Sequence, residues 1–393
     1  MGQLVHERHP DVPVRYALTN RTKRVRLADV VSEEDLRREL DYVRTLHFTK
    51  SELHYLRGTN EYQDRMFAEP YLQFLAGLQL PPYTLAVHDG QFELEFVGKW
   101  SEAIYWETLA LSIVNELYYR ALMKKLSPFE QELVYARGKM NLAEKIALLR
   151  TRPDITICDF GTRRRFSREW QMYVDRNLAA ELPGQFLGTS NTFSAMLHSL
   201  VPMGTSAHEM YMVMSGVMHG SDDDIRASHN RVLVEWWERY GHGLSIALTD
   251  TYGSDFFFRD MTREQAQNWK GLRQDSGDPL VFGERAIGFY QNHQIDPRDK
   301  LLVFSDGLDL PTIIRIADHF KDRIKVSFGW GTNLTNDMGF PALSLVVKAV
   351  EANGHDTVKL SDNLAKATGS PEDVARFKQI FGHTVTASEE CRY

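Results

Sequence analysis

Residues 159–167 read Asp159-Phe160-Gly161-Thr162-Arg163-Arg164-Arg165-Phe166-Ser167. The apolar run at residues 155–158 leads into this stretch and is typical of a short buried strand, and a helix-like pattern follows from about Arg168 to Leu182. A strand, a glycine turn and a helix start together direct backbone N–H groups and a helix dipole at an anion. The three arginines add fixed positive charge in forked form. The stretch therefore predicts an anion site, although a run of charge is also typical of a solvated surface.

The same polar, glycine-rich chemistry recurs downstream, where further short apolar runs end. With the first, there are seven such junctions: Asp159–Thr162, Gly188–Asn191, Gly204–Glu209, Asp250–Gly253, Arg273–Pro279, Ser305–Gly307 and Gly329–Asn333. Apolar runs that alternate with helical stretches are typical of a parallel βα architecture. Because the polar loops are spread along the whole run, we predict an irregular βα barrel, whose functional residues collect at the carboxyl ends of its strands. A doubly wound open sheet, which would concentrate the loops at one switch point, is the alternative.

The chain before residue 150 has a different pattern, which indicates an α+β unit. Alternating apolar residues predict half-buried strands at 14–19 and 92–97. Ser32 and Ser127 each stand three residues before an acidic residue, which is typical of a helix start. From Ser101 we expect one continuous apolar helix that runs through Leu117.

Length sets the domain organisation. A chain of 393 residues is too long for one small core, so two domains are expected. We place an α+β domain at 1–150 and a βα barrel at 151–365. A C-terminal tail at 366–393 is expected to pack back on the body.

Composition argues against several classes of protein. A net charge of −7 argues against a general nucleic-acid binder, so any anion site must be a local basic pocket. The two cysteines, Cys158 and Cys391, indicate neither a disulfide framework nor a zinc cluster. No apolar run has the length of a membrane span, and the N-terminus lacks the pattern of a signal peptide. We expect a cytoplasmic protein with neither a nucleic-acid nor a membrane partner.

The segment Arg273-Gln274-Asp275-Ser276-Gly277-Asp278-Pro279 is the most site-like motif. Its arginine can clamp a diphosphate, and the carboxylate two residues on can accept hydrogen bonds from ribose hydroxyls. Other motifs are weak alone. Residues 305–307 can be a helix cap, residues 331–333 an ordinary turn, and His208 a core histidine.

Taken together, the motifs resemble the nicotinate phosphoribosyltransferase family. The similar segments are Asp159–Ser167, Gly188–Asn191, Gly204–Glu209, Arg273–Pro279, Phe328–Asp337, Leu94–Trp100 and Trp106-Glu107. The resemblance implies an N-terminal α+β domain on an irregular βα barrel of the type II phosphoribosyltransferase kind. It also implies a homodimer with sites at the subunit boundary.

The resemblance implies a reaction too. Nicotinate and phosphoribosyl pyrophosphate would form nicotinate mononucleotide and pyrophosphate, the first step of NAD salvage from nicotinate. A ligase-type coupling would hydrolyse ATP through a phosphohistidine, and the matching histidine is His208. Mg²⁺ would enter with the phosphates of phosphoribosyl pyrophosphate and ATP.

Each site residue has an expected role on this basis. The catalytic set comprises His208, Asp250, Arg273 and Asp275, with Asp250 orienting the imidazole of His208. Nicotinate is expected at Phe160, Arg163 and Asn191. Phosphoribosyl pyrophosphate is expected at Arg163, Arg273, Asp275, Ser305, Asp306, Gly307, Gly331 and Thr332.

One motif of the family has no counterpart near Met1. The family usually begins with an Asp-x-Tyr-Lys segment, whose tyrosine is expected to stack on the pyridine ring in the neighbouring subunit. Either this sequence enters after that segment, or the aromatic lid is supplied in another way.

Two other functions stay open. One is a related barrel enzyme that uses nicotinamide or quinolinate, and the other is a catalytically silent barrel with a binding or regulatory role. The position that resembles the amide-recognising aspartate of nicotinamide enzymes is Asn191, which lacks the charge that would repel a carboxylate.

Overall fold

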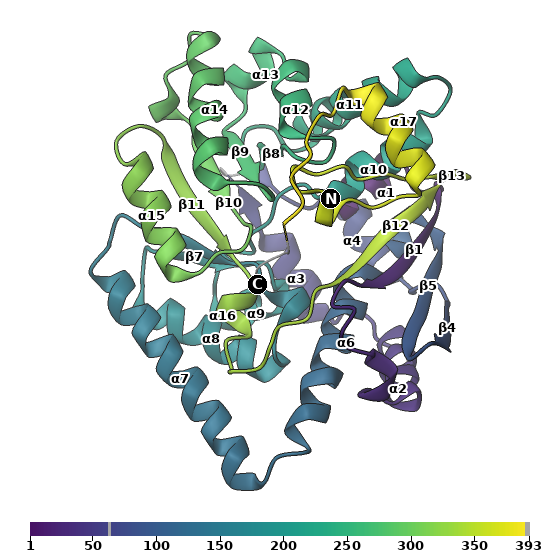
Figure 1. The fold of residues 1–393 in the computed structure, drawn as a ribbon, viewed down its shortest axis with the longest axis vertical. Helices are drawn as coiled ribbons and strands as arrows, with labels where there is room; N and C mark the ends of the chain where they lie inside the picture. The colour runs from purple at the N-terminus through teal and green to yellow at the C-terminus, as the bar shows by residue number, and fades with distance from the viewer. Residues whose placement is uncertain (62–63, 390–393) are drawn as a thin grey trace.

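The computed structural model describes residues 1–61 and 64–389. Within these ranges the framework is a six-stranded parallel sheet beside a five-stranded antiparallel sheet (Figure 1). A two-stranded ribbon of β2 (Asn60–Glu61) and β3 (Asp64–Arg65) lies apart from both.

The parallel sheet has the strand order β7-β6-β11-β10-β9-β8. Its strands are β6 (Ile157–Asp159), β7 (Phe186–Thr189), β8 (Ile246–Leu248), β9 (Gly271–Gln274), β10 (Leu301–Phe304) and β11 (Lys325–Trp330). The last strand, β11, pairs with the first, β6, which is the neighbour relation of a barrel and not of a doubly wound sheet. This strand order confirms the predicted irregular βα barrel. The sheet is not closed among the described residues, because its two end strands, β7 and β8, do not pair.

Helices follow most of these strands. They include α8 (Arg168–Glu181), α9 (Thr192–His198), α10 (His208–Val217), α11 (Asp222–Tyr240), α12 (Ser254–Asp260), α13 (Arg263–Asn268), α14 (Pro279–Asn292), α15 (Leu310–Phe320) and α16 (Thr332–Thr335). Short 3₁₀ turns lie at Leu27–Asp29, Thr162–Arg164, Pro297–Asp299 and Leu364–Lys366. Side-chain oxygens cap several of the helices, and Asp278 and Asp309 do so at the starts of α14 and α15.

The loop at Gly204–Glu209 differs from its prediction as a strand end. The chain before it forms only an isolated parallel bridge, between Thr189 and Pro202. His208 is the first residue of α10. Six strands, not seven, therefore present loops to the carboxyl edge within the described part of the barrel.

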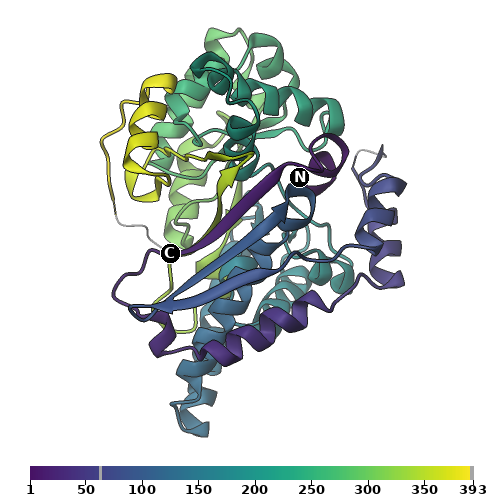
Figure 2. The same ribbon diagram turned by 90° about the vertical axis from the view of Figure 1, so that its right-hand side faces the viewer.

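The antiparallel sheet has the order β13-β12-β1-β5-β4 (Figure 2). Its strands are β1 (Pro13–Asn20), β4 (Tyr83–His88), β5 (Gln91–Lys99), β12 (Leu345–Ala352) and β13 (His355–Asp356). Asp89 and Gly90 join β4 to β5 with φ of 48° and 73°, as a two-residue hairpin turn requires. Because β12 pairs with β1, the proposed barrel segment 151–365 includes two strands of the N-terminal sheet.

The helices of the N-terminal half lie against this sheet, against one another or against the barrel, where α7 packs on α8. They are α1 (Gly2–Arg8), α2 (Glu33–Arg44), α3 (Lys50–Gly58), α4 (Glu69–Ala76), α5 (Trp100–Ala103), α6 (Trp106–Met123) and α7 (Pro128–Arg150). The single helix expected from Ser101 is wrong, because the chain breaks between α5 and α6. Trp100 and Trp106 are both fully buried, and their indoles bond to different partners, Glu209 and the Pro81 carbonyl. A continuous helix would place them about 120° apart.

Two further features bear on the surface. α17 (Pro371–Phe381) packs on the barrel helices, with Phe381 stacked 3.9 Å from the ring of Tyr252. α6 and α7 meet in a hairpin that projects from the lower end of the molecule (Figure 1). Among the described residues, no helix is long and apolar enough to cross a membrane.

Candidate active site

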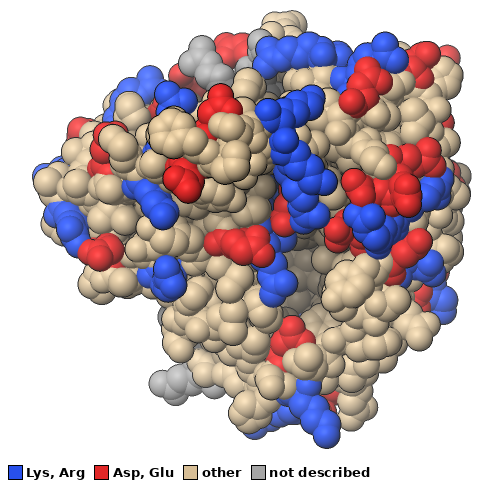
Figure 3. All heavy atoms as spheres, turned by 90° about the horizontal axis from the view of Figure 1, so that it is seen from below, with Lys and Arg blue, Asp and Glu red and all other residues tan. Residues whose placement is uncertain are grey.

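A cavity of about 330 Å³ lies at the carboxyl ends of the barrel strands, between the barrel and β12. Ten of the twelve predicted site residues line it: Phe160, Arg163, His208, Arg273, Asp275, Ser305, Asp306, Gly307, Gly331 and Thr332. Asp250 and Asn191 do not. On the face seen from below, basic side chains stand beside a hollow (Figure 3).

His208 is held from both of its ring nitrogens. Nδ1 lies 2.9 Å from the hydroxyl of Thr251. Nε2 lies 3.0 Å from Oδ2 of Asp275 and 2.9 Å from the ammonium of Lys359. Burial and the nearby Lys359 charge lower the pKa of His208 to about 4. The imidazole is therefore neutral at pH 7, as a nucleophile requires.

Asp250 lies behind His208 and does not hold the imidazole as predicted. Its Oδ1 is 3.8 Å from Nε2, whereas its Oδ2 accepts a 2.5 Å hydrogen bond from Ser276. Thr251, the next residue, makes the contact that fixes the ring. Although burial opposes ionisation of Asp250, His208 and Lys359 lower the pKa of its carboxyl.

Asp275 lies at the centre of the hydrogen bonds at the carboxyl ends of the strands. Its Oδ1 accepts from Arg273 at 3.1 Å and from the hydroxyl of Ser305 at 3.0 Å. Arg273 also donates to Ser305 and to Thr205, each at 2.8 Å. Although burial opposes the charge, Arg273 and the hydrogen bond to His208 lower the pKa of Asp275 well below its usual range. A fixed carboxylate thus lies between the guanidinium and the imidazole.

Three lysines of the cavity were missed in the sequence, and two of them, Lys359 and Lys366, are buried. Lys348, on β12, donates to Glu107 at 3.0 Å, and Lys359 contacts His208. Lys366 donates to the Asp275 carbonyl at 2.7 Å and to Asp306 at 2.5 Å. Burial lowers the pKa of Lys359 to about 8. The available signal was a single lysine in an apolar run, as in Leu345-Val346-Val347-Lys348-Ala349-Val350, because the strand around such a lysine is buried and holds it away from open solvent.

Arg163 pairs with a buried acid at the cavity wall while part of its side chain stays exposed. Its guanidinium pairs with Glu107, which Lys348 also contacts. Although burial opposes ionisation of Glu107, Lys348 and Arg163 lower the pKa of its carboxyl. The other end of the basic stretch is closed to anions, because Glu116 accepts from the backbone N–H of Arg168 at the start of α8. The expected anion site is thus at the cavity wall and not at the α8 N-terminus.

Phe160 and Asn191 have different positions. Phe160 is half-buried in the cavity wall, and the guanidinium of Arg273 lies 5.6 Å from its ring centre. Asn191 caps α9 by accepting from Ser194, and its amide donates to Gln171 at 3.0 Å. Because its amide oxygen and its amide nitrogen both have protein partners, Asn191 fixes the start of α9 beside the cavity and does not line the cavity itself.

One group of side chains has the composition of a metal site. His208, Asp250 and Asp275 place ligand atoms within 4.8 Å of one another. The ammonium of Lys359 already lies among them, 2.9 Å from His208 Nε2 and 3.9 Å from Asp250 Oδ2. A lysine cation thus neutralises these donors, and the set does not fit a resident metal.

Comparison with known proteins decides the family. Residues 155–385 match the nicotinate phosphoribosyltransferase (NAPRTase) family, and residues 1–115 match its N-terminal domain. This chain belongs to the nicotinate phosphoribosyltransferase family. The resemblance seen in the sequence is confirmed, and the matches support an enzyme that forms nicotinate mononucleotide.

Solved structures agree over nearly the whole chain. A nicotinate phosphoribosyltransferase from Vibrio cholerae is 32% identical with a TM-score of 0.87, covering 97% of this chain and 91% of that one. One from Porphyromonas gingivalis is 29% identical with a TM-score of 0.86, covering 97% and 96%.

Proposed function

We propose that this chain transfers the phosphoribosyl group of phosphoribosyl pyrophosphate to nicotinate and couples the transfer to ATP hydrolysis through His208. The observation that carries the proposal is the composition of one cavity. Arg273, Lys348, Lys359 and Lys366 bring four cations to a carboxylate, Asp275, and to a neutral imidazole. A polyanionic sugar substrate needs such cations, and a phosphoryl acceptor needs such an imidazole.

The transfer step breaks the bond between ribose C1 and the diphosphate. Positive charge develops on the sugar and negative charge on the leaving group, so fixed cations lower the barrier. Arg273 and the lysines would hold the diphosphate. Asp275 would accept hydrogen bonds from the ribose hydroxyls and offset the charge on the sugar. Ser305, Asp306, Gly307, Gly331 and Thr332 line the adjoining wall, where the 5-phosphate would bind.

Nicotinate would bind on the Phe160 side of the cavity. The exposed part of the Phe160 ring offers a stacking surface for the pyridine. Arg163 supplies the charge for the carboxylate, and Asn191 supports this wall through Gln171. A carboxylate and a carboxamide differ by one charge, so Arg163 favours nicotinate over nicotinamide.

The coupling step is a phosphoryl transfer to His208. Nε2 attacks the γ-phosphorus of ATP, an N–P bond forms, and the P–O bond to ADP breaks. Water later cleaves the N–P bond and releases phosphate. Attack requires the tautomer with its proton on Nδ1, where the Thr251 hydroxyl can accept the hydrogen bond and the Nε2 lone pair replaces the contact with Asp275. Lys359, 2.9 Å from Nε2, lies where its ammonium can turn to the phosphoryl oxygens and offset their charge. Mg²⁺ would accompany the phosphates of both substrates.

The chain is expected to act as a homodimer with shared sites, in the cytoplasm. The described surface contains a suitable apolar face on the projecting helix α7. Phe129, Leu133 and Met140 lie along one side of it and are 68%, 52% and 64% exposed. Exposed apolar patches of this kind mark protein contacts.

Substrate comparison tests the proposal. Purified protein is given phosphoribosyl pyrophosphate with nicotinate or nicotinamide, with and without ATP, and the mononucleotide product is quantified. We expect turnover of nicotinate, a strong preference over nicotinamide and a lower KM for phosphoribosyl pyrophosphate with ATP. Equal use of the two pyridines would contradict the assignment, and absence of any mononucleotide would favour a binding or regulatory protein.

A further inference from the structure

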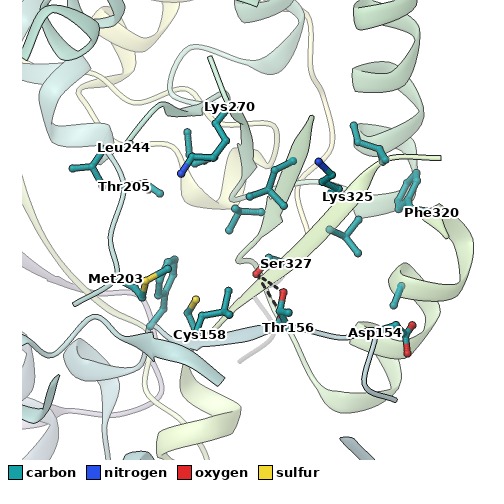
Figure 4. A pocket seen from close by; sticks show the side chains of 18 of the residues that line it. Asp154, Thr156, Cys158, Met203, Thr205, Leu244, Lys270, Phe320, Lys325 and Ser327 are labelled. Carbon is teal, nitrogen blue, oxygen red and sulfur yellow. Dashed lines mark hydrogen bonds between the residues drawn. The ribbon is translucent and has the colours of Figure 1, made fainter. Parts of the chain in front are cut away.

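A second cavity lies inside the barrel, at the end away from the active-site cavity. It measures about 860 Å³. Its outer lining comes from the amino-terminal ends of the strands, with Leu301 and Lys325 the first residues of β10 and β11 and Lys270 just before β9 (Figure 4). A volume of this size is typical of a site for a small molecule.

The lumen is hollow because the sequence does not fill it. Barrel interiors are normally packed with layers of bulky, branched side chains. In the outer layer, neighbouring strands are in register at Ile246, Gly271, Leu301 and Lys325. Gly271 contributes no side chain to this layer, and Lys325 contributes a long, flexible one. In the next layer Thr156 and Ser327 are small, and their hydroxyls bond each other at 3.1 Å.

The lining of this cavity has an apolar part and a charged part. Cys158, Leu187, Ile246, Val303 and Phe320 give apolar walls. The outer rim has four cations and two acids: Lys270, Arg298, Lys321, Lys325, Asp154 and Asp322. One acid, Asp154, is paired 2.7 Å from Arg152 outside the lining. Among the cations, Arg298 is paired with Asp296 and Lys270 donates to the Gly243 carbonyl at 2.6 Å, which leaves Lys321 and Lys325 beside Asp322. The rim therefore suits an anionic head, and the walls suit an apolar body.

The inner end of the lumen meets the active site. Phe160, Met203 and Thr205 line both cavities. Arg273 lies over the Phe160 ring and donates to Thr205. A molecule that fills the lumen would contact the residues that position this guanidinium.

We propose that the barrel lumen is a second ligand site, which takes a molecule with an apolar body and one carboxylate. The carboxylate lies at the Lys325 rim, and the body extends inward to Phe160. Occupancy changes the position of Arg273 and thereby weakens binding of phosphoribosyl pyrophosphate.

Dodecanoate is a suitable probe, with dodecanol as its uncharged control. Binding is measured by calorimetry on the full chain, below the concentration at which dodecanoate forms micelles. We expect one site, with dodecanol at least about tenfold weaker, a difference of roughly 1.4 kcal/mol. Val303→Trp should abolish binding by filling the lumen, and Lys325→Glu should weaken it about tenfold through charge reversal. Dodecanoate should also raise the KM for phosphoribosyl pyrophosphate in the wild type.

Two controls keep the result interpretable. Ile246→Trp fills the outer layer instead of the inner one, in case Val303→Trp does not fold, and thermal unfolding shows whether each variant is folded. The site is overturned if wild type binds no dodecanoate, or if a folded lumen-filling variant binds it as tightly as wild type. Because binding is measured without turnover, the result is independent of the proposed transferase activity.

Discussion

The two sides of the active-site cavity are built in different ways. The barrel side contributes His208, Arg273 and Asp275 from loops and helix starts at the carboxyl edge. The opposite side contributes Lys348, Lys359 and Lys366 from the segment that returns to the N-terminal sheet. Hydrogen bonds join the members of the first set. The lysines contact that set from another part of the chain, with Lys348 on β12, Lys359 in an isolated bridge with Thr368 and Lys366 in a 3₁₀ turn.

This difference separates two functions within one site. The barrel side contains the groups that interact with the reacting atoms, so its loss should lower kcat. The lysine side supplies charge for phosphates, so its loss should raise the KM for phosphoribosyl pyrophosphate. The following variants test that division, from the largest expected effect to the smallest.

Asp275→Asn should have the largest effect. It removes the charge that faces the developing sugar cation and breaks the contacts with Arg273 and His208. We expect kcat/KM to fall on the order of 10²–10³-fold, the usual loss for one group that stabilises a transition state. Asp278→Asn is the matched control in the same motif, because Asp278 only caps α14. A comparable loss in both variants would assign Asp275 a structural role.

Lys348→Met should act mainly on substrate affinity. It removes a half-buried cation and leaves Glu107 with Arg163. We expect the KM for phosphoribosyl pyrophosphate to rise about 10–100-fold, with a smaller change in kcat. Lys300→Met is the control, since Lys300 is also largely shielded from solvent but bonds to the Gln267 and Trp269 carbonyls outside the cavity. If only kcat fell, the division between the two sides would be wrong.

The pH profile should separate His208 from Lys359. Burial lowers the pKa of His208 to about 4, so ATP-coupled turnover should stay level from about pH 7 to pH 5.5, through the ordinary histidine pKa. Above about pH 8 turnover should fall as Lys359 loses its proton, and Lys359→Arg should remove this decline. A fall centred near the ordinary pKa of histidine would show that the imidazole is not held neutral.

The same histidine makes a matching contribution to stability. Between about pH 6.5 and pH 4 the unfolded chain protonates this histidine while the folded chain does not. The unfolded state then binds more protons, so the His208 contribution to stability decreases as pH falls through this window. Urea titrations of wild type and His208→Asn across these pH values should show a shallower decrease for the variant.

Pyridine selection should show the smallest effects. Arg163→Ala should raise the KM for nicotinate about tenfold. Asn191→Asp should reduce the preference for nicotinate by only a few fold, because the aspartate keeps the cap on α9 and so its position beside the cavity, although it loses the donor to Gln171. A larger effect from Asn191→Asp would place that side chain in contact with the pyridine substituent.

The barrel and most of its loops were predictable because their information is local. Apolar runs followed by Gly, Ser, Thr or Asp mark strand ends, and ten of the twelve predicted residues line one cavity. The Ser127 helix start was likewise correct, as a capping box with Glu130. The barrel preference over a doubly wound sheet rested on the spread of these loops, and the β11–β6 pairing supports it.

The remaining features depend on tertiary structure. Pairing of β12 with β1 brings Lys348 to the cavity from about 180 residues after Arg163, and no local pattern reports such a pairing. The sequence predicted that Asp250 orients His208, but Thr251 does so. The two are neighbours in one loop, and the sequence does not show which of two adjacent side chains faces the ring. The lumen cavity depends on how the strands are aligned with one another, which no single strand of the sequence reveals.

The most direct test of the account is phosphorylation of His208 by ATP. The chain is incubated with γ-labelled ATP, and the labelled peptide is mapped under alkaline conditions that preserve phosphohistidine. His229, also buried and 2.6 Å from a carboxylate, Asp260, serves as the internal control outside the cavity. We expect label on the His208 peptide alone, and loss of both label and ATP stimulation in His208→Ala, with slow ATP-independent transfer retained. Label on another residue, or ATP hydrolysis that still keeps pace with product formation in His208→Ala, would contradict the account.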